Sequence, residues 1–210
     1  SMQNKQSQKV MDEIERVTLN HYESNSESFW QGTRDHDVSQ NITALLDALP
    51  KDHVLDLLDF GCGPGRDLLA LKSLGHRAIG LDGNKTFCEM AEKHSGCSVL
   101  HQQFLSLDIG TDCFDGIFAN ASMFHVPSQE LPRVLVACNK ALREGGVLFT
   151  SNPRGNAEGW QGQRYGNYME FEENKACLEQ AGFALENHYY RPEGRPRDQQ
   201  PWLAIVSKSV

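Results

Sequence analysis

The sequence predicts a doubly wound α/β fold with a mostly parallel sheet of seven strands. Three observations favour it. Apolar, strand-like runs alternate with amphipathic helical segments, which is typical of parallel strands with right-handed crossovers. A glycine-rich turn directly follows the first buried run, 53–60. The last third ends in two strand-like runs joined by a connection, which predicts an antiparallel hairpin that closes the sheet.

Each element follows from its own pattern. Apolar residues at helical spacing predict helices over 9–20 and 37–50, with a polar loop between them. The expected strands are 53–60, 77–82, 98–102, 114–120, 145–151, 183–190 and 202–209. The expected helices between them are 66–75, 85–94, 129–142 and 170–182. We expect one domain, in which residues 1–52 form a helical cover over the ligand site and residues 53–210 form the core.

Composition narrows the class of partner. Lys and Arg number 20 against 28 Asp and Glu, and the resulting net charge of −8 repels polyanions, so nucleic acid is not an expected partner. The six cysteines form no C-x-x-C pair, so we expect neither a metal site nor a disulfide framework. We find no signal peptide and no apolar run of about 20 residues, and therefore expect a cytoplasmic protein that does not enter a membrane.

The most informative motif is the turn after the first strand. That strand ends in Asp59, and Gly61, Cys62, Gly63 and Gly65 then form a G-x-G-x-G turn at the start of a helix, where backbone can closely approach a ligand. A dinucleotide site requires G-x-G-x-x-G, whereas Arg66 stands where the third glycine would lie. A turn shaped only for packing is the alternative.

A second acidic residue strengthens the motif. The second strand ends in Asp82, followed by Gly83, about twenty residues after Asp59. An acid at this place can accept hydrogen bonds from both hydroxyl groups of a ribose. The pair therefore indicates a nucleoside-containing ligand.

These residues carry a family resemblance. The run 54–84 resembles class I S-adenosylmethionine-dependent methyltransferases, and the resemblance continues through 114–126 and 141–153. It implies a Rossmann-like fold with S-adenosylmethionine as cofactor and S-adenosylhomocysteine as product. It also implies that the glycine turn meets the methionine part of the cofactor and Asp82 its ribose. Gln103 and Phe104 would flank the adenine, although many relatives place an aspartate where this chain has Gln103; the amide oxygen can still meet the adenine amino group.

Other residues are candidates on weaker grounds. Asn120, at the end of the fourth strand, is expected to contact the cofactor. Trp30 and Arg34 are candidates for closing over it, and simple packing of the N-terminal helix is the alternative. His125 is a candidate proton acceptor, or else only a polar group that borders the cofactor.

Two C-terminal segments give a more specific resemblance. Residues 151–168 and 188–209 are together similar to the C-terminal methyltransferase domain of the ovothiol biosynthesis enzymes, which methylates 5-thiohistidine (4-mercaptohistidine) on its imidazole ring. In larger family members this domain follows a sulfoxide synthase. The resemblance therefore implies either an excised domain or a stand-alone enzyme that works with such a synthase.

A small amino-acid substrate needs a partner for its carboxylate, and an arginine fork supplies one. We expect 152–168 to be a substrate-binding loop; a mobile solvated loop is the alternative. The substrate-binding candidates are Asn152, Arg154, Arg164, Tyr165, Tyr190, Arg191 and Arg195, and the catalytic candidates are His125, Tyr165 and Tyr168. Pairing of the arginines with Glu170, Glu172 and Glu173 is the structural alternative. Two other functions stay open: methylation of another small amino acid or carboxylate, and cofactor binding without catalysis.

Overall fold

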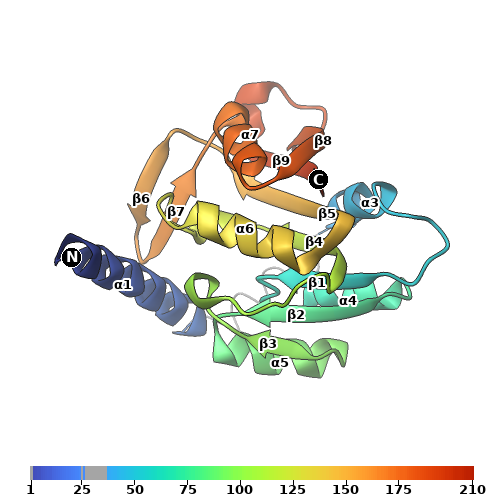
Figure 1. Ribbon diagram of the computed structural model, residues 1–210, viewed down its shortest axis with the longest axis horizontal. Helices are drawn as coiled ribbons and strands as arrows, with labels where there is room; N and C mark the ends of the chain where they lie inside the picture. Colours follow the sequence, from blue (N-terminus) through green and yellow to red (C-terminus); the bar gives the residue numbers. More distant parts are fainter. Residues whose placement is uncertain (1, 25, 27–36) are drawn as a thin grey trace.

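The computed structural model describes residues 2–24, 26 and 37–210, and these form the expected doubly wound α/β fold (Figure 1). The main sheet has seven strands in the order β3-β2-β1-β4-β5-β9-β8. Strands β1 to β5 are parallel, and β9 and β8 add an antiparallel hairpin at one edge. The seven strands are β1 Asp56–Phe60, β2 Arg77–Asp82, β3 Val99–His101, β4 Phe114–Asn120, β5 Leu142–Pro153, β8 Phe183–Arg191 and β9 Trp202–Ser209.

Helices cover both faces of this sheet. Their bounds are α1 Met2–Ser24, α3 Ser39–Asp47, α4 Arg66–Ser73, α5 Lys85–Ser95, α6 Leu131–Ala141 and α7 Phe171–Gln180. Figure 1 shows α6 lying across β4 and β5. On that face the core joins α6 and α7 to side chains such as Leu58, and on the other face it joins α3 and α4 to side chains such as Leu57. Successive strand residues point to opposite faces, which is why a strand covered on both sides has a continuous apolar sequence.

The segment 152–168 is not the long loop that the sequence predicts. Strand β5 continues to Pro153, and β6 Ala157–Gln161 and β7 Arg164–Tyr168 form a separate two-stranded antiparallel hairpin. Gln161 pairs with Arg164 across a two-residue turn in which Gly162 has φ 61°, and the rings of Trp160 and Tyr165 meet edge to face. Glycines in both strands hide the alternating pattern, because they supply no side chain to either face.

Helix α1 is longer than the predicted 9–20 and reaches the hairpin. Figure 1 shows both at the same end of the molecule, where α1 and β7 are in contact. Met11 and Ile14 of α1 pack with Leu105 and with the partly buried Tyr165. Helix α1 and the β6–β7 hairpin therefore pack against each other at this end of the molecule.

Two glycines offer a matched test of the packing around the turn after β1. Gly65 and Gly75 both have φ in the left-handed region, 103° and 94°, but a Cβ on Gly65 would lie 2.8 Å from Ala91 Cα in α5, whereas one on Gly75 would meet nothing within 4 Å. We expect Gly75→Ala to lower the free energy of unfolding by about 1 to 2 kcal/mol, the cost of the backbone conformation. We expect Gly65→Ala to lower it by about 1 to 3 kcal/mol more, because α4 and α5 must separate. Urea unfolding without ligand measures both, and equal losses would contradict the close packing of α4 on α5.

Candidate functional site

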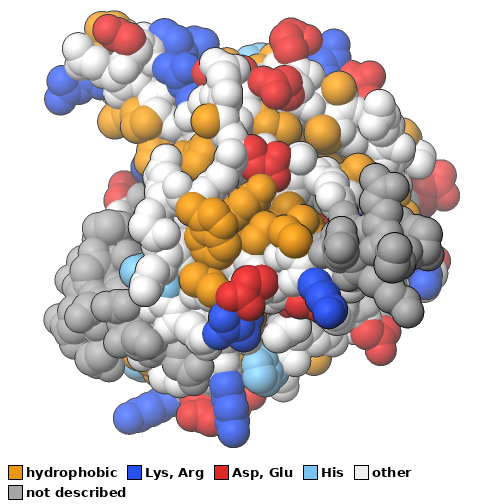
Figure 2. Space-filling model, turned by 90° about the vertical axis from the view of Figure 1, so that its left-hand side faces the viewer, with side chains coloured by type: hydrophobic (Ala, Val, Ile, Leu, Met, Phe, Trp, Pro, Cys, Tyr) orange, Lys and Arg blue, Asp and Glu red, His pale blue; other side chains and the backbone are white. Residues whose placement is uncertain are grey.

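A cavity of about 840 Å³ lies at the carboxyl ends of the parallel strands. Its walls come from the turn after β1, the ends of β2 and β4, helix α1, the β6–β7 hairpin and the end of β8. Figure 2 looks onto this end of the molecule, where hydrophobic side chains gather at the centre with charged side chains of both signs around them. A site here agrees with the rule that ligands of open α/β sheets bind beyond the carboxyl ends of the strands.

The glycine turn forms the floor of this cavity. The backbone N–H groups of Gly61 and Cys62 both donate to the Leu81 carbonyl oxygen, which fastens the turn to β2. A Cβ on Gly61 would lie 2.4 Å from Ser122 Cβ, in the loop after β4. Only glycine therefore allows the two loops to meet, and Gly61, Cys62 and Gly63 line the cavity. Gly65 does not line it; it begins α4.

Asp82 lies beside this floor with its carboxylate held by backbone groups. It accepts hydrogen bonds from the N–H of Gly63 at 2.9 Å and from that of Asn84 at 2.9 Å. Burial raises the pKa of Asp82 from 3.8 to about 6, although the hydrogen bonds to Asn84 and Gly63 oppose the shift. The carboxylate is thus fixed in place and partly desolvated, with lone pairs left for a ligand's hydroxyl donors.

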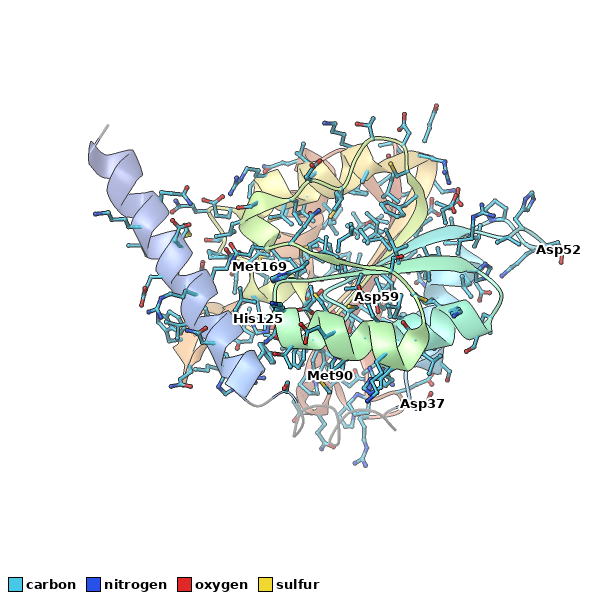
Figure 3. All side chains as sticks on the ribbon, turned by 90° about the horizontal axis from the view of Figure 1, so that it is seen from below. Asp37, Asp52, Asp59, Met90, His125 and Met169 are labelled. Carbon is cyan, nitrogen blue, oxygen red and sulfur yellow. The ribbon has the colours of Figure 1, made fainter. Side chains whose placement is uncertain are left out.

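Asp59, predicted to contact the cofactor, does not line the cavity. Its side chain is 1% exposed, and one of its carboxyl oxygens has no hydrogen-bond partner. Figure 3 shows it in the interior of the molecule. Burial, together with the nearby carboxyl groups of Asp67 and Asp82, holds the pKa of Asp59 well above its usual range. The prediction of direct contact is therefore corrected: Asp59 lies beneath the turn.

Of the other cofactor candidates, four line the cavity and two lie outside the described residues. Gly83, Gln103, Phe104 and Asn120 line the cavity. Phe104 also stacks on Phe60 of β1, with ring centroids 4.4 Å apart, which fixes its ring beside the floor. Trp30 and Arg34 lie outside the described residues, so their predicted contacts stay predictions.

His125 lines the cavity, but its ring nitrogens are already hydrogen-bonded. Nδ1 lies 2.8 Å from the Tyr165 carbonyl oxygen, which can only accept, so Nδ1 carries the proton. Nε2 then accepts from the Tyr22 hydroxyl at 2.8 Å, and the oxygen of Tyr22 in turn accepts from Arg164 Nη1 at 3.2 Å. Burial lowers the pKa of His125 to about 4. His125 is therefore a neutral residue, and the group it holds toward the cavity is Tyr22.

The catalytic candidate Tyr165 is corrected on geometry. Its hydroxyl donates to Glu158 at 2.8 Å, and it is the backbone of Tyr165 that meets His125. Burial and the Glu158 carboxylate raise the pKa of Tyr165 to about 12. The side chain does not line the cavity, whereas Tyr168, two residues further along β7, does.

Of the seven substrate-binding candidates, two line the cavity and five do not. Arg164 and Arg191 line the cavity, and among the described residues neither forms an ion pair with a carboxylate. Arg191 donates to the Asp37 carbonyl oxygen, and Arg164 lies over the Tyr22 ring.

Arg154, Arg195, Tyr190 and Asn152 do not line the cavity. Arg154 forms an ion pair with Glu170 at 3.2 Å and donates to the carbonyl oxygens of Gln200 and Arg197. Arg197 lies 3.4 Å over the Tyr190 ring, so this part of the β8–β9 connection is held by its own contacts. The side chain of Asn152 accepts from the Phe124 backbone N–H and thereby positions the loop that carries His125.

The sequence predicts a helical cover over the site from residues 1–52 but does not single out the residues of α1 that form it. Helix α1 contributes Ile14, Glu15, Thr18, Leu19 and Tyr22, which recur at intervals of three and four residues and therefore share one face of the helix. That spacing is the signal by which the sequence could have identified them. Asn41 and Asp67 are further cavity residues that no motif singled out.

Within the described ranges, no helix is long and apolar enough to cross a membrane. The same residues contain no group of three or more His, Cys, Asp or Glu side chains arranged to hold a metal ion.

Comparison with known proteins finds methyltransferases. Residues 57–146 match the family described as "Methyltransferase domain". The chain is 30% identical over 122 residues to a malonyl-[acyl-carrier protein] O-methyltransferase of Xylella fastidiosa (strain M23), a match that spans 55% of this chain but only 41% of that protein.

Solved structures share the fold over nearly the whole chain. One is the 1,6-didemethyltoxoflavin-N1-methyltransferase of Burkholderia thailandensis with bound 1,6-didemethyltoxoflavin and S-adenosylhomocysteine (TM-score 0.77, 21% identity, 95% of this chain and 90% of that chain). Another is a putative methyltransferase of Haloferax volcanii in complex with the Trm112 activator (TM-score 0.73, 15% identity, 93% and 97%).

The chain has the fold of class I S-adenosylmethionine-dependent methyltransferases, and its residues 57–146 match the methyltransferase domain family. The expected Rossmann-like fold is confirmed. The finer likeness to the ovothiol enzymes rests on the sequence segments alone.

The state of His125 is open to direct measurement. We expect its ring to be neutral with the proton on Nδ1 from roughly pH 5 to 8, because burial places its pKa at about 4. The folded pKa lies below the ordinary value of 6.5, so this group destabilises the protein as pH falls from about 6.5 to about 4. Long-range ¹H–¹⁵N NMR of the imidazole reports the tautomer. In Tyr22→Phe the Nε2 signal should shift while Nδ1 stays protonated; an Nε2-protonated ring in the wild type would contradict the assignment.

Proposed function

We propose that this protein transfers the methyl group of S-adenosylmethionine to a small acceptor that carries a carboxylate, and that this acceptor is 5-thiohistidine, methylated on its imidazole ring. One observation carries the proposal: Arg164 and Arg191 line the cavity beside the glycine turn without an ion-pair partner among the described residues. A cation left unpaired in a ligand cavity favours an anionic ligand.

The part of the site that we assign to the cofactor is the glycine turn and the residues beside it. We assign the methionine part of S-adenosylmethionine to the turn Gly61–Gly63 and to Asn120, its ribose to Asp82, and its adenine to the wall made by Gln103 and Phe104. The backbone-held carboxylate of Asp82 supports this assignment, because two vicinal hydroxyl groups can both donate to it.

The acceptor half faces α1 and the hairpin. Arg164 from β7 and Arg191 from β8 are suited to a carboxylate, and the rings of Tyr22, Phe124 and Tyr168 are suited to the faces of a flat heteroaromatic ring. The choice of thiohistidine in particular rests on the sequence resemblance of 151–168 and 188–209. The second of these segments, 188–209, contributes less than that resemblance implies, since only Arg191, Pro192 and Trp202 of it line the cavity.

Methyl transfer requires mainly that the acceptor nitrogen be aligned with the methyl group. The sulfonium is already activated, so the ring nitrogen's lone pair forms the new N–C bond as the S–C bond breaks, and S-adenosylhomocysteine leaves. A neutral His125 that holds Tyr22 adds no positive charge beside the sulfonium. Released protons pass to water in this scheme, because His125 with a pKa of about 4 is a poor acceptor near neutral pH.

The alternative acceptor is another small amino acid or carboxylic acid. The name of the Xylella relative describes an O-methyltransferase of a malonyl group, and the same two arginines would hold such a carboxylate. By its name the Burkholderia neighbour methylates a ring nitrogen, but at 21% identity its likeness reaches the fold and not the substrate.

Calorimetric titration of 5-thiohistidine into protein saturated with S-adenosylhomocysteine tests the acceptor, with histidine as the control ligand. We expect saturable binding of the thiol compound. Arg164→Gln should weaken it about tenfold to a hundredfold, because a charge-assisted hydrogen bond is lost. The exposed Arg195, outside the cavity, gives the matched control, and Arg195→Gln should change the affinity by less than about twofold.

No binding of 5-thiohistidine to the wild type would reject that acceptor and turn the search to other carboxylates. Equal effects of the two arginine variants would reject the assignment of Arg164.

The pH dependence of cofactor binding tests Asp82. Ribose hydroxyls donate to the ionised carboxylate, so we expect S-adenosylhomocysteine to bind about tenfold more weakly at pH 5 than at pH 8, given a pKa of about 6. Asp82→Asn should bind weakly throughout and lose this slope.

In the unliganded protein, the contribution of Asp82 to stability should change with pH in the direction opposite to that of the cofactor affinity. A raised folded pKa favours the protonated form, so the contribution of Asp82 to stability falls as pH rises from about 4 to about 6. If the affinity of the wild type did not change with pH, the ribose assignment would be wrong.

A further inference from the structure

A chain of partly buried hydrogen bonds connects the C-terminal hairpin to the cavity floor. The Tyr189 hydroxyl of β8 donates to Asn41 Oδ1 at 2.6 Å, and Asn41 Nδ2 of α3 donates to Asn120 Oδ1 at 3.2 Å. Asn120 Nδ2 donates to Asp67 Oδ2 at 3.1 Å, and Arg66 Nε donates to the other carboxyl oxygen of Asp67 at 2.8 Å. The chain therefore joins β8, α3, the end of β4 and the start of α4.

The direction of every bond is determined by its acidic end. Asp67, ion-paired with Arg66, can only accept, so Asn120 must turn its amino group toward Asp67 and its carbonyl oxygen toward Asn41. Asn41 must then present its amino group to Asn120, which leaves its oxygen for Tyr189. Only a donor satisfies that oxygen, and the phenol supplies it. Asn41 is 2% exposed, so water has little access to replace the phenol.

Removing the phenol O–H would disturb the whole chain. The buried oxygen of Asn41 would lose its donor, and turning the amide over would place two carbonyl oxygens against each other at Asn120. If Asn120 also turned, its oxygen would face the Asp67 carboxylate. Both Asn120 and Asp67 line the cavity, so this rearrangement would change the polar groups that a ligand contacts.

The chain also ends at an acidic part of the cavity wall. Asp67 and Asp82 both line the cavity beside the glycine turn, where Asp67 accepts from Asn120 and Asp82 accepts from Gly63. Such a wall favours the cationic part of a ligand over a neutral one, and S-adenosylmethionine carries a sulfonium that S-adenosylhomocysteine lacks.

We propose that Tyr189 and Asn41 are positioning residues that hold Asn120 and Asp67 in the orientation that selects the cationic cofactor. Tyr189 does not itself line the cavity and acts through Asn41. Because β8 continues two residues further to Arg191, which does line it, the same chain ties the acceptor wall to the cofactor floor. The inference rests on the cofactor and is independent of which acceptor the enzyme methylates.

Calorimetry with two cofactor analogues provides the test. Sinefungin has an ammonium group in the region of the sulfonium, whereas S-adenosylhomocysteine is uncharged there. We expect Tyr189→Phe to weaken sinefungin about tenfold while S-adenosylhomocysteine changes by less than about threefold. Asn41→Ala should have the same selective effect. Tyr190→Phe is the matched control, since Tyr190 packs against Arg197 and has no place in the chain of hydrogen bonds.

Thermal unfolding of each unliganded variant accompanies the titrations. A selective loss of sinefungin in Tyr189→Phe and Asn41→Ala, absent from Tyr190→Phe, supports the proposal. An unchanged ratio of the two affinities overturns it. Equal weakening of both analogues also overturns it, because a merely structural role would lower both together with the unfolding temperature.

Discussion

The hydrogen bond from the Gly63 backbone to the buried Asp82 carboxylate is the constraint on which the site depends. It joins the turn after β1 to the end of β2 and gives Asp82 a fixed direction. The turn can reach that position only because Gly61 has no side chain to meet Ser122 and Gly65 none to meet Ala91. The close contact of α4 with α5, the floor of the cavity and the position of the Asp82 carboxylate thus follow from one local arrangement.

Charge is distributed unevenly around that arrangement. Asp67 and Asp82 line the cavity beside the glycine turn, and Arg164 of β7 and Arg191 of β8, which form no ion pair with a carboxylate among the described residues, also line it. A net charge of −8 would otherwise disfavour anions, so an anionic acceptor needs this local exception. Under the proposed function, a cationic methyl donor and an anionic acceptor would be drawn to different parts of one cavity.

Polar groups in the site are oriented by hydrogen bonds to neighbouring protein groups. The Tyr165 carbonyl oxygen fixes the tautomer of His125, and His125 fixes the hydroxyl of Tyr22. Asp67 does the same for two asparagines. Each case uses a group that can only accept to remove the ambiguity of a group that can do both, which limits the number of competing arrangements.

The sequence by itself determined the main sheet, its helices and the glycine turn that forms the cavity floor, because these depend on local patterns. Apolar runs such as Leu57–Leu58, the spacing of Gly61, Gly63 and Gly65, and the acid at Asp82 all lie within single segments. Only the tertiary structure decided the rest. Glycines hid the alternating pattern of the β6–β7 hairpin. The face of α1 that bears Tyr22 could be assigned to the cavity wall only once its neighbours were known. The sequence also does not distinguish the arginines that line the cavity from those that form ion pairs elsewhere. Arg154 forms an ion pair with Glu170, whereas Arg164 forms none within the part of the chain that the structure describes, and that difference depends on long-range contacts that no local pattern records.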